Sequence, residues 1–235
     1  MQKTILFSSD KYQLNGTLHL PAFKNPPVII GSHGLLSTGD SPKQIALAKR
    51  CTEHGMAYFR YDHRGCGKSN GEFSSATTFE GRCHDLIAAV KTVQDLPETG
   101  EAIALFGSSF GGAISLALAE SLDIASIVTV AAPLFSKGIK EPYVNDPTNR
   151  PLMQMLDKDK LFFDIRDRVT LITHLLIFHG DDDRIVPFKN ALELKHNAKE
   201  PKMLICQKNG DHPMSNKIHQ KEFIDQAVAW FEKYF

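Results

Sequence analysis

The sequence predicts an α/β fold: a mostly parallel sheet of about eight strands with helices on both faces. Short apolar and β-branched runs alternate with helical patterns along most of the chain, as in parallel sheets that are covered on both sides. The 235 residues are 42% hydrophobic and carry 27 basic and 27 acidic side chains. We therefore expect one globular domain, residues 1–235, with a large core.

The elements follow from these patterns in chain order. Two strand-like stretches, about 3–8 and 12–20, are joined by a short polar turn and indicate an antiparallel hairpin. Strands and helices then alternate. The expected strands are 28–33, 57–61, 102–106, 124–130, 175–179 and 202–206, and the expected helices are about 41–54, 80–96, 110–121, 188–197 and 217–234.

The alternation lapses between residues 132 and 173, where four prolines lie among charged and apolar side chains. A segment of this length between two core strands is more often functional than idle. We interpret 132–173 as a small cap between strands 6 and 7; an ordinary crossover helix with long loops fits equally well. Its aromatic and methionine residues indicate an apolar acyl or alcohol pocket, or else dock the cap on the sheet.

Charge and cysteine usage exclude several classes of function. The balanced charge gives no footprint for nucleic acid or an anionic membrane surface. The absence of a signal-peptide or membrane-spanning pattern leads us to expect a cytoplasmic location, and no pattern indicates an oligomeric state. The cysteines lack C-x-x-C spacing, so we expect free thiols, mostly packed in the fold, and no zinc site: Cys51, Cys66, Cys83 and Cys206.

The segment Gly107-Ser108-Ser109-Phe110-Gly111 matches the pattern G-x-S-x-G between a predicted strand and a predicted helix. With Gly and Ser at about 7% each, chance supplies this pattern roughly 0.08 times in a chain of this length. A strand, a sharp turn and a helix can hold a serine hydroxyl exposed, and the glycines permit the strained turn. Ser109 is the candidate nucleophile; the alternative is a glycine-rich turn without chemistry.

An activated serine needs a base and a group that orients the base. The loop after strand 175–179 carries Asp181, Asp182 and Asp183, and the loop after the last strand carries His212. Both loops follow the carboxyl ends of parallel strands, where open α/β sheets bind ligands. His212 is the candidate base because of this position, and His219 in the following helix is the next choice.

Taken together, these motifs resemble the α/β-hydrolase superfamily, whose chain order is Ser…Asp…His. The segment from His179 to Pro187 is similar to the family's H-G-x-x-D-x-x-V-P, which aligns the triad acid with Asp183. The segment Gly210-Asp211-His212 resembles the turn that carries the family's histidine. The resemblance covers nearly the whole chain and implies the α/β-hydrolase fold.

An oxyanion hole needs two backbone N–H donors. One candidate is Phe110, which follows the nucleophile at the start of a helix whose dipole favours negative charge. The segment from Ser32 to Leu36 is similar to the family's His-Gly segment, which implies the N–H of Leu35 as the second donor.

The segment from Asp62 to Ser69 resembles another family loop, D-x-R-G-x-G-x-S, and lacks the spacing of the Walker phosphate-binding motif. We interpret it as a structural loop in which Arg64 or Asp62 braces neighbouring turns.

The resemblance implies a serine hydrolase of the carboxylesterase, cinnamoyl or feruloyl esterase-like and serine aminopeptidase-like branch. We expect it to cleave a carboxylic ester of a small or medium acyl or aryl substrate through an acyl-enzyme on Ser109, with no cofactor and no metal. A thioesterase or an amidase of aminopeptidase type would use the same three residues. A hydrolase fold that serves as a silent binding or regulatory module is the alternative of another class.

Overall fold

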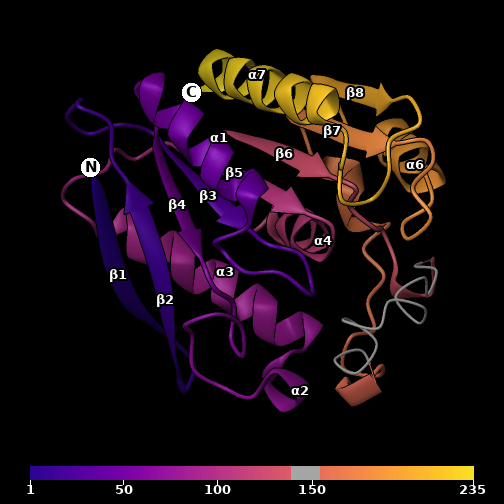
Figure 1. The fold of residues 1–235 in the computed structure, drawn as a ribbon, viewed down its shortest axis with the longest axis horizontal. Coiled ribbons are helices and arrows are strands. Elements are labelled where there is room, and N and C mark those ends of the chain that lie inside the picture. The colour runs from indigo at the N-terminus through magenta and orange to yellow at the C-terminus, as the bar shows by residue number, and fades with distance from the viewer. Residues whose placement is uncertain (139–153) are drawn as a thin grey trace.

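The computed structural model describes residues 1–138 and 154–235 and confirms the predicted fold class (Figure 1). In this part of the chain eight strands form one open sheet in the order β1-β2-β4-β3-β5-β6-β7-β8. β2 pairs antiparallel with both β1 and β4, and every other neighbouring pair is parallel. The strands are β1 (Gln2–Ser9), β2 (Tyr12–His19), β3 (Val28–Ser32), β4 (Ala57–Tyr61), β5 (Ile103–Ser108), β6 (Ser126–Val130), β7 (Leu175–Gly180) and β8 (Lys202–Gln207).

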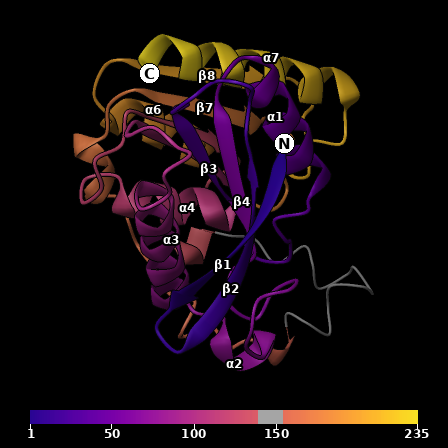
Figure 2. The ribbon, with the colours of Figure 1, turned by 90° about the vertical axis from the view of Figure 1, so that its left-hand side faces the viewer.

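Helices cover both faces of the sheet, so that α1 and α7 lie on the side opposite α3 and α4 (Figure 2). The short helix α6 packs on the same face as α3 and α4. The helices are α1 (Pro42–Glu53), α2 (Phe73–Ala76), α3 (Phe79–Gln94), α4 (Phe110–Leu118), α6 (Lys189–Asn197) and α7 (Lys217–Tyr234), with 3₁₀ turns η1 (Ser136–Gly138) and η3 (Arg168–Leu171).

Local sequence signals explain where several helices begin. Pro42 starts α1, at a position where its missing N–H costs no hydrogen bond. The hydroxyl of Thr78 accepts from the N–H of Gly81 at 2.8 Å and caps α3. The side-chain oxygen of Asn216 accepts from Ile218 at 2.8 Å and caps α7. These caps satisfy N–H groups that the first helical turn leaves free.

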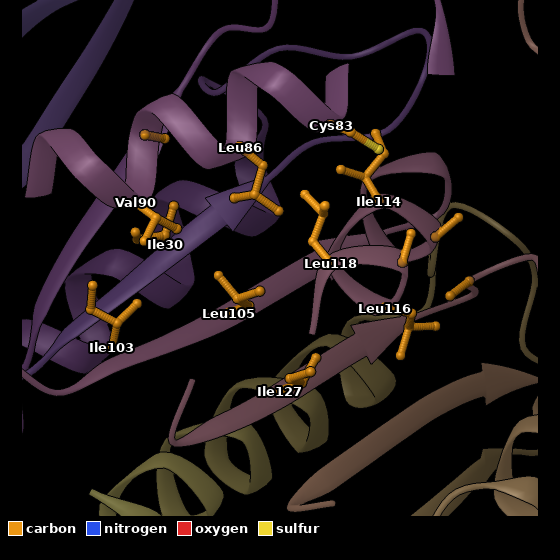
Figure 3. Close-up of a cluster of buried hydrophobic side chains, with 14 of the residues drawn as sticks. Ile30, Cys83, Leu86, Val90, Ile103, Leu105, Ile114, Leu116, Leu118 and Ile127 are labelled. Carbon is orange, nitrogen blue, oxygen red and sulfur yellow. The ribbon is translucent and has the colours of Figure 1, made fainter. Parts of the chain in front are cut away.

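The core has one part on each face of the sheet. Figure 3 shows Leu86 and Val90 of α3 and Ile114 of α4 facing Ile30 and Leu105 of the central strands. On the opposite face, aromatic side chains of β5, β7 and α7 pack together. The central strands β3, β4, β6 and β7 are buried along their whole length, which explains their continuous apolar runs.

The expected strands and the longer helices are confirmed, with ends that differ by a few residues. The exception is α2, whose four residues are too few to show a helical period. The cysteines are free thiols, three of them buried and Cys206 exposed, as expected. Among the described residues, no helix is long and apolar enough to cross a membrane.

The cap expected at 132–173 stays a prediction, because residues 139–153 lie outside the described residues. Its two described flanks are held together by a bridge between Phe135 and Asp164. The second flank packs on the core through Phe163, whose ring stacks on Phe79 of α3 with centroids 4.5 Å apart.

The strand order reverses at β3, because β4 lies on one side of it and β5 on the other. The loops that follow β3 and β5 therefore leave the sheet in opposite directions. Such a switch point opens a crevice at the carboxyl ends of the strands, where doubly wound folds bind ligands. Ser109, directly after β5, lies at this point.

We expect Leu105→Ala to lower the free energy of unfolding by about 2–5 kcal/mol, since it removes a fully buried side chain and leaves a cavity. The matched control is Leu6→Ala on β1, where the leucine is 59% exposed. That variant should lose less than about 1 kcal/mol. Urea unfolding of both variants provides the measurement, and equal losses would contradict the assignment of Leu105 to the core.

Candidate active site

Ser109 occupies a strained turn between β5 and α4. Its backbone angles are φ 53° and ψ −119°, a conformation that L-residues rarely adopt and that costs ~1–3 kcal/mol. The N–H of Ser109 donates to the carbonyl of Val130 at 2.7 Å, which ties the turn to the neighbouring strand β6. The predicted order of strand, sharp turn and helix is therefore present, with Ser109 at the carboxyl end of β5.

The two glycines of the motif are required because backbone meets backbone on both sides of Ser109. A Cβ at Gly111 would lie 2.2 Å from the carbonyl oxygen of Ser32, where α4 contacts β3. A Cβ at Gly107 would lie 2.5 Å from the Cα of Gly112. Only glycine permits these approaches.

The structure brings Ser109, His212 and Asp183 together from three separate loops. Nδ1 of His212 lies 2.7 Å from Oδ2 of Asp183, and Nε2 lies 3.0 Å from Oγ of Ser109. A carboxylate can only accept, so Nδ1 of His212 carries the proton, and Nε2 of the neutral ring accepts from the serine hydroxyl. This arrangement allows His212 to take the proton of Ser109.

A second backbone contact sets the position of the histidine loop. A Cβ at Gly180, the last residue of β7, would lie 2.0 Å from the carbonyl oxygen of Gly210. The loop after β8 can therefore lie directly against the end of β7. This contact places His212 beside Asp183.

Asp183 is buried, and hydrogen-bond donors surround its carboxylate. Oδ1 accepts from the N–H groups of Ile185 and Val186 at 2.9 and 2.8 Å. Burial by itself would raise the pKa of Asp183, but the hydrogen bonds from His179 and His212 outweigh it and hold the pKa well below its usual range. The carboxylate of Asp183 accepts from Nδ1 of His212 and thereby fixes the tautomer of that ring.

The competing acidic residues have other contacts. Asp182 pairs with Arg184 at the surface, and Asp181 accepts from the N–H of Asn209 at 2.5 Å. His219, the alternative base, lies on α7, and within the described residues no hydrogen bond joins it to Ser109. Of these candidates, His212 contacts Ser109, and Asp183 contacts His212.

Sequence reasoning missed His179 as a partner of the acid. Its Nε2 donates to the carbonyl of Val186 at 2.8 Å and lies 3.3 Å from Oδ2 of Asp183. The side chain is fully buried. The signal was available, because His179 opens the same H-G-x-x-D segment that singles out Asp183.

The two predicted oxyanion donors belong to segments that adjoin the candidate nucleophile. A Cβ at Gly34 would lie 3.6 Å from Cβ of Ser109, so the loop after β3 runs directly past the serine. Phe110 follows Ser109 as the first residue of α4. Within the described residues, neither the N–H of Leu35 nor that of Phe110 donates to another group. Both remain predictions as oxyanion donors.

A second chain of the same three residue types lies beneath the loop after β3. Oγ of Ser32 is 2.9 Å from Nε2 of His63, and Nδ1 of His63 is 3.2 Å from Oδ2 of Asp85. All three side chains are fully buried, so no substrate can reach this serine. Sequence reasoning did not find this network, which supports the loop from below.

The loop from Asp62 to Ser69 braces neighbouring turns, as predicted. Asp62 accepts from the N–H groups of Gly39 and Lys68, both at 2.8 Å. Arg64 donates to Asp85 at 2.8 Å and pairs with Asp10 at 2.9 Å. Burial would raise the pKa of Asp85, but hydrogen bonds from His63 and Arg64 outweigh it and lower the pKa to about 2.

No group of three or more His, Cys, Asp or Glu side chains with metal-binding geometry occurs in residues 1–138 and 154–235.

Comparison with known proteins places this chain among described relatives. The model of a family described as serine aminopeptidase S33 matches residues 24–158. The uncharacterized protein YfhR of Escherichia coli O157:H7 is 30% identical over 193 residues, which cover 82% of this chain and 65% of YfhR. The mitochondrial palmitoyl-protein thioesterase ABHD10 of Mus musculus is 24% identical over 220 residues, which cover 81% of this chain and 70% of ABHD10. The chain thus spans about two thirds of the length of these relatives.

A solved structure extends the similarity to the whole fold. Est1E from Butyrivibrio proteoclasticus, solved with bound ferulic acid, matches with a TM-score of 0.77 at 20% identity. The match covers 97% of this chain and 99% of Est1E. At this level of identity, the likeness establishes the shared fold.

The buried His63 predicts a dependence of stability on pH. Burial lowers its pKa to about 4, whereas an unfolded histidine titrates near ~6.5. The unfolded chain therefore binds a proton that the folded chain does not, and stability falls as the pH drops from about 6.5 to about 4. We expect His63→Gln to reduce the slope of the unfolding free energy in this window by up to about 1.4 kcal/mol per pH unit. Urea unfolding at a series of pH values measures it, and parallel curves for the two proteins would rule out this role.

Proposed function

The chain belongs to the serine aminopeptidase S33 family of α/β-hydrolases, whose model matches more than half of it, and on this premise we propose that it hydrolyses carboxylic esters with Ser109 as nucleophile. The observation that carries the proposal is the pair of hydrogen bonds that links Asp183 to His212 and His212 to Ser109. The acyl or aryl group is small or medium in size. The reaction needs no metal or organic cofactor.

In the proposed mechanism, Oγ of Ser109 attacks the ester carbonyl while Nε2 of His212 takes its proton. The negative charge that develops on the carbonyl oxygen is stabilised by the N–H groups of Leu35 and Phe110. His212 then gives the proton to the leaving alkoxide as the ester C–O bond breaks. The acyl group stays bound to Oγ of Ser109. A water molecule, deprotonated by His212, releases the carboxylic acid and restores the serine.

Ester cleavage is favoured because an alkoxide or phenoxide leaving group depends less on protonation by His212 than the amine leaving group of an amide does. A relative named as a palmitoyl-protein thioesterase supports thioesters as the second candidate, since a thiolate leaves as easily. The family description favours an aminopeptidase-type reaction, which places the largest demand on His212. We also propose that the reaction takes place in the cytoplasm.

Rates on p-nitrophenyl esters of graded acyl length, matched acyl thioesters and aminoacyl anilides distinguish these chemistries. We expect the short and medium esters to be cleaved fastest. Faster turnover of thioesters than of oxyesters with the same acyl group would favour the second candidate. No turnover of any substrate, together with no fluorophosphonate labelling of Ser109, would favour a silent binding module.

Ser109→Ala should lower kcat for p-nitrophenyl acetate by roughly 10⁴-fold or more, since it removes the nucleophile. The matched control is Ser108→Ala, which changes the neighbouring serine of the same turn and should keep kcat within about threefold. Thermal unfolding checks that both variants fold. Equal activity of the two variants would exclude Ser109 as the nucleophile.

Asp183→Asn should lower kcat by roughly 10³–10⁴-fold, since a neutral amide neither fixes the tautomer of His212 nor stabilises its cation. The surface residue Asp182 is the matched control, and Asp182→Asn should leave kcat within about twofold. Steady-state kinetics on p-nitrophenyl acetate measure both. A larger loss in the Asp182 variant than in the Asp183 variant would show that Asp183 is not the acid of the site.

A further inference from the structure

The buried Arg82 of α3 directs its side chain at the loop that carries the Leu35 N–H. Nη1 donates to the carbonyl of Gly34 at 3.2 Å, and Nη2 donates to the carbonyl of Leu35 at 3.0 Å. Nη2 also lies 3.2 Å from Sγ of Cys66. The side chain is fully buried, so these contacts replace part of its hydration, and Nε has no hydrogen-bond partner within the described residues.

No carboxylate forms an ion pair with Arg82 among residues 1–138 and 154–235. The nearby Asp85 is hydrogen-bonded to His63 and Arg64 instead. A buried guanidinium without an ion-pair partner is costly, and an apolar side chain would fill the same space at lower cost. What an apolar residue could not supply is the pair of donors to the carbonyls of Gly34 and Leu35.

Peptide geometry connects these contacts to the proposed oxyanion hole. In a trans peptide the carbonyl and the following N–H point in opposite directions. The carbonyl of Gly34 is held from one side by Arg82 and by Nδ1 of His33, which donates to it at 2.8 Å. The N–H of Leu35 belongs to the same peptide and is therefore fixed on the other side.

Two further features suit this role. A cation at the Gly34 carbonyl polarises the peptide and strengthens the Leu35 N–H as a donor. The guanidinium also lies over the ring of Phe110, with Cζ 5.5 Å from the centroid, and Phe110 carries the other proposed donor. One side chain thus contacts both residues of the proposed oxyanion hole.

We propose that Arg82 is a positioning residue that aims the Leu35 N–H at the developing oxyanion of the substrate. This inference rests on the proposed function, because it concerns the transition state of the same hydrolysis. Arg82 itself does not contact the substrate in this proposal.

The test compares Arg82→Met, Arg82→Lys and the parent protein on p-nitrophenyl acetate. Met fills similar space without charge or donors, and Lys keeps the charge but can hold only one carbonyl well. We expect kcat to fall about 10- to 100-fold in the Met variant and less in the Lys variant, with KM changed less than about twofold. Affinity for phenylboronic acid, which mimics the tetrahedral intermediate, should fall by the same factor as kcat/KM.

Arg64→Lys is the matched control, because Arg64 is also buried but contacts Asp85, Ser9 and Asp10 rather than the loop after β3. It should lose stability while kcat stays within about threefold. Circular dichroism measures the folded fraction of each variant, and each rate is divided by that fraction. If Arg82→Met does not fold, the comparison of Arg82→Lys with the parent protein provides the test.

Unchanged kcat and boronate affinity in folded Arg82 variants would overturn the inference while the proposed function stands. A fall in kcat matched by the Arg64 control would also overturn it, as a general effect of lost stability. If the parent protein neither hydrolyses esters nor reacts with a fluorophosphonate, the proposed function itself fails, and the inference fails with it.

Discussion

The candidate site depends on one close contact, that of the first turn of α4 with the end of β3. Because Gly111 has no side chain, α4 can approach the carbonyl of Ser32, and the chain must then turn sharply at Ser109. The strain in that turn is held by the hydrogen bond to Val130 and by the burial of α4. The same contact places the loop after β3 beside the serine, so that one packing constraint positions both the hydroxyl and the Leu35 N–H.

Hydrogen-bond geometry alone does not identify the candidate nucleophile, since Ser32, His63 and Asp85 repeat the pattern of Ser109, His212 and Asp183 at similar distances. The two chains differ in access. The chain of Ser32, His63 and Asp85 is enclosed by the core and stabilises the loop after β3. Ser109, by contrast, lies half-buried at the switch point of the sheet. Solvent access and backbone strain together separate a reactive arrangement from a structural one.

The sequence predicts what depends on local patterns. Alternating apolar runs indicate the strands and longer helices, and three short motifs indicate Ser109, Asp183 and His212. Contacts between distant segments leave no such pattern, which is why the roles of Arg82 and the His63–Asp85 network emerge only from the fold. The packing of α3 against the loops after β3 and β4 creates these contacts, and no periodicity of α3 singles out Arg82. The four residues of α2 are likewise too short to predict.

The buried charges are distributed in the way the proposed reaction requires. Attack by Ser109 makes His212 a cation and the carbonyl oxygen of the substrate an anion. The carboxylate of Asp183 lies on the side where the positive charge forms. Arg82 and the N-terminus of α4 lie on the side of Leu35 and Phe110, where the negative charge forms. Asp85 is hydrogen-bonded to His63 and Arg64 rather than to Arg82. The donors of Arg82 go instead to the carbonyls of Gly34 and Leu35, so its charge lies against the loop that carries one of the proposed oxyanion donors.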